Sequence, residues 1–581
     1  MKEQIHALLQ QALNVIAKEQ GLSLPEGAQF NIERPRDASH GDFSSNIAMV
    51  FCKVFKMPPR GLAERIISLI PQHPGIAEVS IAGPGFINIV LNQDLFKEKL
   101  ENMWQSIDCG VEVIDHKQTV VVDYSSPNLA KEMHVGHLRS TIIGDAIARV
   151  LELKGYQVIR QNHVGDWGTQ FGMLIAHFDD ESRAHPEEVM LNDLETFYKA
   201  AKLRFDSEPA FAERARNLVV ALQSGDPKCL EMWKAFIDLS IDHCQEVYER
   251  LGVALKPSDV RAESAYNDDL PLIVTFLKEK GLLIEHDGAQ CVFMEEFKGK
   301  DDELLPVIVQ KKDGGFLYAS TDLAAIRFRH EALHANRVLY VVDARQSLHF
   351  QQVFALAKLA GFADETMQLE HISFGMVLDK SGRPYKSRDG GVTKLADLLD
   401  ESERRARKLI ESKQTQHFSE QELANMANII GISSVKYADL SKHRTSDYVF
   451  DWDTMISFDG NTAPYLLYAF TRIQSIFQKT QMAEQDLKTG FILESHHDED
   501  LAKQLLLFPE VVDAVCVKAT PHLLCTYLYE LAGTFSSFYE ACPILNQEEP
   551  LRTSRLKLVA LTARILKKGL GLLGITTLTR M

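Results

Sequence analysis

The sequence lacks several patterns that mark common classes of protein. Its eight cysteines form no CxxC pair, so neither a zinc site nor a disulfide framework is indicated. No apolar run approaches the roughly 18 residues that a membrane span needs. The first twenty residues carry charges throughout and have helical periodicity, which argues against a signal peptide. We therefore expect a cytoplasmic protein without membrane contacts and without a metal site of its own.

Positive charge is scarce as well. The chain has 63 Lys and Arg against 80 Asp and Glu, a net charge of −17. Taken as an average, this charge disfavours nucleic-acid binding, because phosphate contacts need Lys and Arg. Residues 551–581 differ, since they contain seven Lys or Arg and no Asp or Glu. Such a local excess matters more for binding than the total.

The length of 581 residues is about four times that of a typical domain, so we expect several hydrophobic cores. We predict a small α/β domain at residues 1–110, an α/β domain with a doubly wound parallel sheet at 111–455, and an all-helical domain at 456–581. Mostly polar helical segments interrupt the strand–helix alternation at about 175–305, which indicates a helical insertion. The helices expected there cover residues 193–205, 209–223 and 229–251.

The stretch from 119 to 172 is the centre of the predicted α/β domain. It opens with a β-branched apolar run at 119–122 that is typical of a buried strand. Apolar residues recur at helical spacing over 138–154, and Gly155 occupies the usual C-terminal cap position. A second strand is predicted at 156–160. Such βαβ units bind ligands beyond the carboxyl ends of their strands.

His134, Gly136 and His137 lie where this helix begins. A helix N-terminus offers free N–H groups and partial positive charge, so it favours phosphate. The imidazoles can donate hydrogen bonds, the glycine permits close approach of a flat ligand, and Lys131 adds a full charge nearby. Two other interpretations fit the histidine pair: metal ligation, for which no third ligand is evident, and surface side chains that cap the helix.

The surroundings of the motif favour the phosphate site. The order of strand, Ser-Pro-Asn turn, HVGH and helix resembles the HIGH region of class I aminoacyl-tRNA synthetases, and SPNxAKxxHxGHLRSTIIGD is similar to the arginyl-tRNA synthetases in particular. The resemblance covers nearly the whole chain. It implies an arginine–tRNA ligase, in which L-arginine and ATP, with Mg²⁺, give arginyl-adenylate, and the arginyl group then passes to the 3′ end of tRNA(Arg). The catalytic residues implied are His134, His137 and Lys131.

The resemblance also implies an arginine pocket. A guanidinium is planar, permanently charged and carries five donors, so a selective pocket needs acceptors and a carboxylate. In the family, the positions of Tyr318 and Asp322 contact the side chain, while those of Asn128 and Gln346 hold the α-amino and carboxylate end. Thr321 or Asp322 is also expected to cap the next helix, at 323–333, after a predicted strand at 314–320. The arginine-binding set is Asp123, Ser126, Asn128, Glu263, Tyr318, Asp322 and Gln346.

The loop DKSGRPYKSRDGG stands where class I enzymes carry KMSKS, and it departs from that pattern. Aligning Arg388 with the family's variant form KMSxRxG puts Pro384 at the first lysine. The missing charge could come from Lys386, Lys380 or Lys131. We expect this basic, glycine-rich loop to bind phosphate, because it follows a strand, predicted at 370–378, on the ligand side. The ATP-binding set is His134, Gly136, His137, Met376, Lys386 and Arg388.

A turn and an edge strand are predicted at GPGFINIV in the N-terminal domain. Arginyl-tRNA synthetases have a similar domain that contacts the elbow of the tRNA, with PGFxN on the contact surface. Phe86 would stack on an unpaired base and Asn88 would read its edge. An ordinary edge strand is the alternative.

The C-terminal region resembles the helical anticodon-binding domain of the same family. Thr462 is expected to cap a helix that has Pro464 in its first turn, with two tyrosines and an arginine on one face. Three basic residues spaced seven and four apart share a face of the last helix. A merely solvated face, or one at a membrane surface, is the alternative there. The tRNA contacts implied are Tyr465, Tyr468, Arg472, Lys557, Arg564, Lys568 and Met581.

Two further expectations follow from the resemblance. Arginyl-tRNA synthetases, like the glutamyl and glutaminyl enzymes, activate the amino acid only with tRNA bound, so tRNA(Arg) should be required for the first step; the chain should act as a monomer. The alternatives are a class I synthetase for another amino acid, a Rossmann oxidoreductase, and a nucleic-acid-binding protein without catalysis. The oxidoreductase has least support, because HVGH stands where GxGxxG would follow the first strand.

Overall fold

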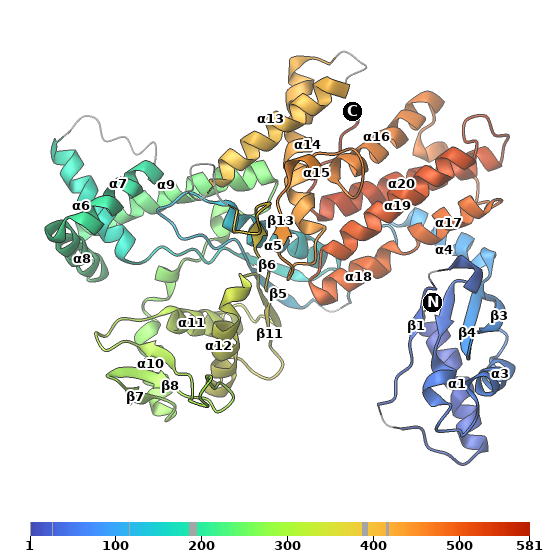
Figure 1. The fold of residues 1–581 in the computed structure, drawn as a ribbon, viewed down its shortest axis with the longest axis horizontal. Helices are drawn as coiled ribbons and strands as arrows, with labels where there is room; N and C mark the ends of the chain where they lie inside the picture. The colour runs from blue at the N-terminus through green and yellow to red at the C-terminus, as the bar shows by residue number, and fades with distance from the viewer. Residues whose placement is uncertain are drawn as a thin grey trace. The chain divides into compact units, whose positions relative to one another are not determined.

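The computed structural model describes residues 2–25, 27–35, 37–115, 117–184, 194–385, 393–413 and 418–581 (Figure 1). The chain divides into two compact units. Unit 1 consists of Met1–Gly110, Ala483–Leu507 and Ser537–Leu561, and unit 2 consists of Val111–Met482, Phe508–Ser536 and Thr562–Met581. The C-terminal helical region contributes residues to both units.

Unit 1 contains a four-stranded antiparallel sheet in the order β1-β2-β4-β3. Ile87 and Ile89 of β4 belong to its core, and α3 packs against α1 and α2 beside the sheet (Figure 1). The elements are α1 (Lys2–Glu19), β1 (Ile32–Glu33), β2 (Phe43–Ser45), α2 (Ile47–Phe51), α3 (Pro59–Leu69), β3 (Ile76–Ala82), β4 (Phe86–Leu91), α4 (Gln93–Gln105) and α17 (His496–Leu505).

Unit 2 contains a parallel sheet in the order β11-β10-β5-β6. Three consecutive valines of β5 are fully buried, as expected for a strand covered on both faces. α5 connects β5 to β6 and α12 connects β10 to β11, so the predicted α/β fold with a parallel sheet is confirmed. The elements are β5 (Thr119–Asp123), α5 (Val135–Leu153), β6 (Gln157–Gln161), β10 (Arg337–Tyr340), α12 (Ser347–Ala360) and β11 (Gln368–His371).

The helix α5 begins at Val135, three residues before its apolar pattern predicts. A cap made by His134 adds this polar first turn. At the other end Gly155 has φ +89°, and its N–H donates to the Glu152 carbonyl. A left-handed residue at this position is the usual C-terminal cap, so the predicted role of Gly155 is confirmed.

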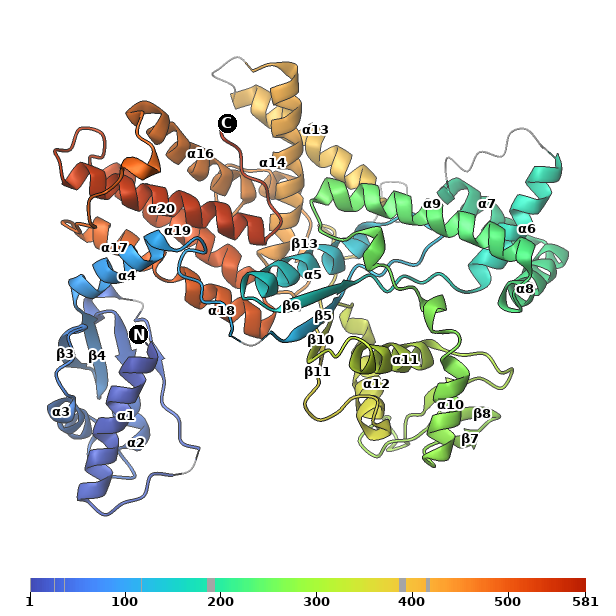
Figure 2. The same ribbon diagram turned by 180° about the vertical axis from the view of Figure 1, so that it is seen from behind.

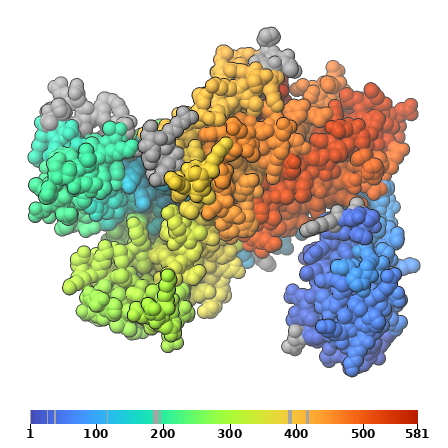
Figure 3. All heavy atoms as spheres, viewed as in Figure 1, coloured from blue at the N-terminus to red at the C-terminus, as the bar shows by residue number. Residues whose placement is uncertain are grey.

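The segment between β6 and β10 begins with the expected helices. α6 (Thr169–Ala184), α7 (Leu194–Ser207) and α8 (Pro209–Gln223) pack together at one end of α9 (Pro227–Leu251), as Figure 2 shows from behind. Their atoms gather in one lobe of unit 2 in the space-filling view (Figure 3).

The later part of this segment is not all helical, contrary to the prediction. After α10 (Leu270–Glu279) comes an antiparallel sheet of β7 (Ile284–His286), β8 (Ala289–Val292) and β9 (Val307–Gln310). The two residues between β7 and β8 are Asp287 and Gly288, both with positive φ. This Asp-Gly pair is a strong hairpin signal that the polar composition of the segment obscured.

The strand predicted at 314–320 is also wrong. A turn follows β9, with Gly314 at φ +83°, and it leads directly into α11 (Tyr318–Glu331). The glycines of this stretch are therefore turn residues rather than strand residues. Because α11 starts at Tyr318, Asp322 lies inside the helix and is not its N-cap.

One core cluster of unit 2 lies between α10, α11, α12 and the parallel sheet. Leu323 and Ile326, three residues apart on α11, belong to it together with Val338 of β10 and Leu356 of α12. This packing fixes the start of α11 beside the carboxyl end of β10.

The strand predicted at 370–378 is divided into β11 and a separate β12 (Val377–Leu378), which pairs in parallel with β13 (Tyr448–Val449). No helix in the described ranges is long and apolar enough to span a membrane. The remaining helices are α13 (Leu395–Lys413), α14 (Glu420–Leu440), α15 (Trp452–Met455), α16 (Ala463–Thr480), α18 (Phe508–Lys518), α19 (His522–Ala541) and α20 (Leu551–Leu572).

Candidate active site

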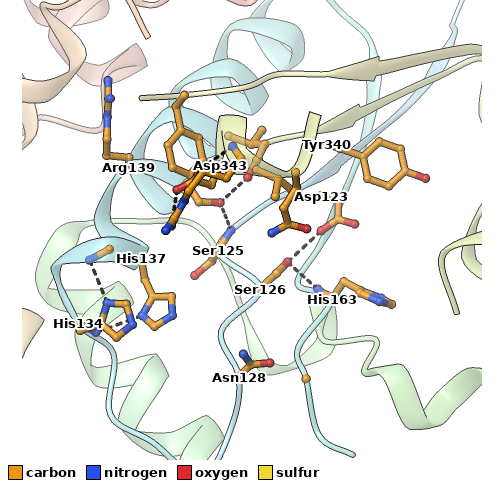
Figure 4. A pocket seen from close by; sticks show the side chains of 18 of the residues that line it. Asp123, Ser125, Ser126, Asn128, His134, His137, Arg139, His163, Tyr340 and Asp343 are labelled. Atoms are coloured by element: carbon orange, nitrogen blue, oxygen red, sulfur yellow. Dashed lines mark hydrogen bonds and ion pairs between the residues drawn. The ribbon is translucent and has the colours of Figure 1, made fainter. Parts of the chain in front are cut away.

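A cavity of about 880 Å³ opens at the carboxyl ends of β5 and β10 (Figure 4). These strands are neighbours in the sheet. The chain continues from β5 to β6 and from β10 to β11, and β6 and β11 lie on opposite sides of this central pair. Such a switch point is where parallel α/β sheets bind ligands. The walls come from the turn after β5 and from the starts of α5 and α11. The segments after β10 and before β12 complete them.

His134 and His137 lie side by side in this cavity, with ring centroids 3.9 Å apart (Figure 4). Nδ1 of His134 accepts a hydrogen bond from the Gly136 N–H (3.0 Å), and Nδ1 of His137 accepts one from the His134 N–H (3.1 Å). Because both Nδ1 atoms are acceptors, each neutral ring carries its proton on Nε2. The histidines therefore cap α5 and also keep two Nε2–H donors beside its N-terminus.

Burial lowers the pKa of His137 to about 3, and the charges of His134 and Lys131 act in the same direction. The imidazole is therefore neutral at physiological pH and donates a hydrogen bond without carrying a full charge. Gly136 is required by this packing, because a Cβ atom there would lie 2.7 Å from Cε1 of His134.

The turn after β5 has an unusual backbone. Ser125, Ser126 and Ala130 all have positive φ, at 69°, 46° and 72°. Residues other than glycine rarely adopt this region, and strain of this kind is found mostly at ligand sites. The turn is held by the Ser126 N–H, which donates to Oδ1 of Asn162 (2.9 Å), and by the Ser126 hydroxyl, which donates to Asp123 (2.9 Å).

Asn128 reaches the cavity from the same turn. It forms a β-bridge with Gly165, where an added Cβ atom would lie 2.2 Å from Oδ1 of Asn128. Glycine is therefore the residue that permits the close approach of the loop after β6 to the Ser-Pro-Asn turn. Gly165 lines the cavity as well.

An acidic wall forms the other part of the cavity, which Glu263, Tyr318, Asp322 and Gln346 line. Burial raises the pKa of Glu263 to about 7, and the charges of Asp166 and Asp322 add to the effect. No Lys or Arg in the described part of the chain pairs with Glu263 or Asp322. Grouped carboxylates without a cationic partner favour a cationic ligand.

Asp123 was expected to bind arginine, but both of its oxygens have protein partners. Oδ1 accepts from the Ser126 hydroxyl, and Oδ2 accepts from Nη2 of Arg329 (2.6 Å). The Arg329 side chain is fully buried in the last turn of α11, whose buried residues are otherwise mostly apolar. Asp123 therefore supports the turn after β5. The only sequence signal for Arg329 was a basic residue at a position where helical spacing predicts burial.

A second buried ion pair was also missed by sequence reasoning. Arg139 of α5 contacts Asp439 of α14 (3.0 Å), donates to the Ser446 carbonyl (3.0 Å), and lies over the Tyr448 ring (5.3 Å to its centroid). These contacts attach the helix that carries both histidines to β13, the partner of β12. Figure 4 shows the Arg139 side chain pointing away from the two histidines.

Met376 lines the cavity just before β12. Its N–H donates to Oδ1 of Asp447 (2.6 Å), and its carbonyl accepts from the Tyr448 N–H (3.1 Å). Pro384, which the predicted alignment sets at the first KMSKS lysine, forms a bridge with Leu378 and also lines the cavity. The part of this loop that the structure describes, residues 379–385, therefore lies beside the cavity.

The lysines considered as substitutes for the KMSKS lysine differ in their surroundings. Lys380 pairs with Asp451 (3.1 Å), and Nζ of Lys131 lies 4.7 Å from the centroid of the Tyr198 ring. Lys386 and Arg388 lie outside the described residues.

Comparison with known proteins accounts for this arrangement. A family model described as "tRNA synthetases class I (R), catalytic domain" matches residues 102–452. The models for "Arginyl tRNA synthetase N terminal domain" and "DALR anticodon binding domain" match residues 3–91 and 466–581. Two arginine–tRNA ligases, from Idiomarina loihiensis and Stutzerimonas stutzeri, are 57% and 56% identical to the chain over the full length of both chains. The chain belongs to the arginyl-tRNA synthetase family.

Solved structures agree with this assignment. An arginyl-tRNA synthetase from Plasmodium falciparum matches all of the chain and 99% of its own, with a TM-score of 0.86 and 30% identity. One from Thermus thermophilus matches over the full length of both chains with a TM-score of 0.80, and at 22% identity it shows the shared fold. The protein is a class I arginine–tRNA ligase, as predicted, and the oxidoreductase and the noncatalytic alternatives are excluded.

The two tRNA-binding residues predicted in the family's N-terminal domain have different environments. Phe86 is 38% exposed. Asn88 is 4% exposed, and its Oδ1 atom accepts from the Ser44 hydroxyl of the neighbouring strand (2.7 Å). Asn88 therefore supports the sheet, and its oxygen is not open to a base, contrary to the prediction.

The predicted start of α16 is confirmed, since Thr462 is its N-cap and accepts from the Tyr465 N–H (3.3 Å). Tyr465 packs against Tyr529 (5.5 Å between centroids), whereas Tyr468 is 49% exposed. Arg472 is half-buried. Their role in tRNA binding stays a prediction.

The basic face predicted for α20 is wrong at Lys557, which is only 3% exposed. Its Nζ atom contacts both carboxylate oxygens of Glu101 (2.9 and 2.7 Å) and the Thr489 carbonyl (3.2 Å). The spacing of the basic residues placed them on one face, but that face is not solvent-exposed at Lys557. Arg564, Lys568 and Met581 are partly exposed.

Proposed function

We propose that this cavity binds arginine and ATP together, forms arginyl-adenylate, and then transfers the arginyl group to tRNA(Arg). The observation that carries the proposal is the pairing of two chemistries in one cavity. The N-terminus of α5, with two Nε2–H donors, suits a phosphate. Glu263 and Asp322 suit a guanidinium. Arginyl-adenylate carries both groups.

In the first step an oxygen of the arginine carboxylate attacks the α-phosphorus of ATP, and the bond to pyrophosphate breaks. Charge spreads over the phosphate oxygens in the transition state, so fixed donors matter more than a nucleophilic side chain. We assign this role to the Nε2–H groups of His134 and His137, with Lys131 as the nearby cation. Because His137 is neutral, it stabilises the charge by hydrogen bonding and keeps its proton. The remaining ATP contacts we assign are Gly136, Met376, Lys386 and Arg388.

The arginine substrate is assigned to the acidic wall. Tyr318 and Asp322 would contact the guanidinium, and Glu263 would add negative charge to the same region. Asn128 and Gln346 would hold the α-amino and carboxylate end, with Ser126 beside them in the turn that Asp123 supports. A guanidinium held this way presents the substrate carboxylate to the phosphate site.

In the second step a hydroxyl of the terminal ribose of tRNA attacks the carbonyl carbon of the adenylate, the hydroxyl loses its proton, and AMP leaves. We propose that bound tRNA(Arg) is needed for the first step too. Mg²⁺ would enter with ATP as its counter-ion; in the described ranges no group of three or more His, Cys, Asp or Glu side chains is arranged to hold a metal. We propose a cytoplasmic monomer, with tRNA contacts at Phe86, Tyr465, Tyr468, Arg472, Arg564, Lys568 and Met581.

The proposal is tested by charging unfractionated tRNA with each labelled amino acid in turn. We expect arginine alone to be esterified, and we expect AMP and pyrophosphate in amounts equal to the arginyl-tRNA formed. Lysine is the informative competitor, because it matches the charge of arginine without its planar donors. Charging with another amino acid, or with lysine at a comparable rate, would refute the assignment of the acidic wall.

A further inference from the structure

Asp322 has a single protein partner in the described part of the chain. Its Oδ2 atom lies 2.6 Å from Nε2 of His349. The Asp322 side chain is 15% exposed and lines the cavity, and it has no other hydrogen bond or ion pair among those residues. One carboxylate oxygen is thus held by protein, and Oδ1 is left to the cavity.

His349 itself is placed outside the cavity. It lies in the first turn of α12, and the lining residues of the described chain include its neighbours Gln346 and Phe350 but not His349. The imidazole meets the Phe350 ring edge-on, with centroids 5.2 Å apart and an interplanar angle of 75°. Because His349 does not line the cavity, its hydrogen bond to Asp322 is the contact through which we expect it to affect the substrate.

The chemistry of this partner suits a carboxylate that must receive a cation. A hydrogen bond to an ionised carboxylate fixes the plane of its oxygens, which a planar guanidinium has to match. The imidazole of His349 can donate that bond from Nε2. Lys or Arg in the same place would form an ion pair and compete with the substrate. The negative charge of Asp322 also raises the pKa of Glu263, so the two carboxyl groups of the acidic wall influence each other.

We propose that His349 is a positioning residue for arginine selectivity, and that it orients the Asp322 carboxylate so that Oδ1 faces the guanidinium. The inference rests on the proposed role of Asp322 as the guanidinium partner. The pair joins α11 to α12 across 27 residues of sequence. The geometry of the guanidinium site is therefore set by the packing of these two helices.

Three substitutions of His349 separate donation, charge and bulk. His349→Gln supplies a neutral donor at nearly the same distance from the backbone. His349→Met removes the donor and retains volume, and His349→Lys replaces the imidazole with an ammonium group. We expect the Gln variant to stay within about threefold of wild type. We expect the Met variant to raise the KM for arginine by about tenfold or more, since it loses a hydrogen bond to a charged group. The Lys variant should raise it at least as much.

The readout is the split between kinetic constants in tRNA charging. The KM for ATP, the kcat at saturating arginine and the melting temperature should remain close to wild type in the Met variant. The matched control is His330→Met. His330 pairs with Asp364 (3.3 Å) at the other end of α11, and neither residue lines the cavity. This control should leave the KM for arginine unchanged.

A double-mutant cycle identifies the path of the effect. If His349 acts through Asp322, adding His349→Met to Asp322→Asn should produce no further rise in the KM for arginine. Full additivity would overturn the inference, and so would a Met variant that lowers kcat and the KM for ATP together with stability. An unchanged KM in Asp322→Asn would instead refute the proposed function of Asp322. A raised KM in that variant with normal values in His349→Met would refute only the inference about His349.

Discussion

Single residues in this site act through protonation states that burial determines. His137 and Glu263 are shifted in opposite directions for one reason, the cost of a buried charge. The histidine stays neutral, as the proposed hydrogen bond to phosphate requires. The glutamate has a pKa of about 7, so a bound cation would favour its ionised form. One cavity thus holds a neutral donor and a potential anion at the same pH.

Removing the donor should affect the chemical step. For His137→Ala and His134→Ala we expect adenylate formation to slow by about 10²-fold or more, because each variant loses a donor to the phosphate oxygens. The measurement is single-turnover adenylate formation with tRNA present. His137→Gln is the matched control, since its amide restores a neutral donor, and it should recover part of the rate. Near-wild-type rates in both folded alanine variants would contradict the assignment.

The raised pKa of Glu263 predicts a pH dependence of arginine binding. With a pKa of about 7, the carboxyl group gains a proton as the pH falls through this value, and its ionised form attracts the guanidinium. The KM for arginine should therefore rise as the pH falls below about 7, by at most tenfold per pH unit. Glu263→Gln should raise the KM at neutral pH and flatten this profile between pH 5.5 and 7. A profile with the same slope in the Gln variant would assign the titration to another group.

Among the elements, α20 illustrates how a helix with basic spacing is divided between structure and binding. Lys557 is buried against Glu101, so it contributes to the stability of unit 1. Arg564 and Lys568 are partly exposed and remain the residues of this helix assigned to tRNA. We therefore expect substitution of Lys557 to affect stability, and substitution of Arg564 and Lys568 to affect tRNA binding.

Lys557→Gln should lower the free energy of unfolding by about 1–3 kcal/mol, because it leaves the Glu101 carboxylate without its ammonium partner.

The paired substitution Arg564→Gln and Lys568→Gln should instead weaken tRNA binding. Its log–log salt slope should decrease by at most 0.7 to 0.9 per lost phosphate contact. Urea unfolding and binding titrations at several salt concentrations measure the two effects. If the salt slope of tRNA binding changed in Lys557→Gln and not in the paired variant, the assignment of Arg564 and Lys568 to tRNA would be wrong.

For the whole molecule the main expectation concerns tRNA as a participant in the first step. In the predicted alignment of this loop with KMSKS, Pro384 takes the place of the first lysine, and Pro384 lines the cavity. We expect a site completed by tRNA, and therefore no appreciable exchange of pyrophosphate into ATP with arginine alone.

Exchange should appear when tRNA(Arg) is added. The matched control is a tRNA that another synthetase recognises, added at the same concentration, which should not restore exchange. Equal exchange with and without tRNA(Arg) would show that the cavity is complete by itself.

The sequence by itself determined the features whose partners lie close along the chain. The HVGH turn, the Gly155 cap and the Thr462 cap were predictable because each depends on hydrogen bonds within about four residues. The buried β5 strand was predictable because a strand covered on both faces must be apolar throughout. The family assignment rested on the same kind of continuous local pattern.

Only the tertiary structure decided which polar side chains are available to ligands. Asp123 meets Arg329 across 206 residues of sequence, and Lys557 meets Glu101 across 456, so no local pattern could show that these charges are paired. The physical reason is common to both pairs. Helical spacing fixes the face on which a side chain lies, but the elements that pack against that face determine whether its charge meets solvent, a substrate or another residue of the chain.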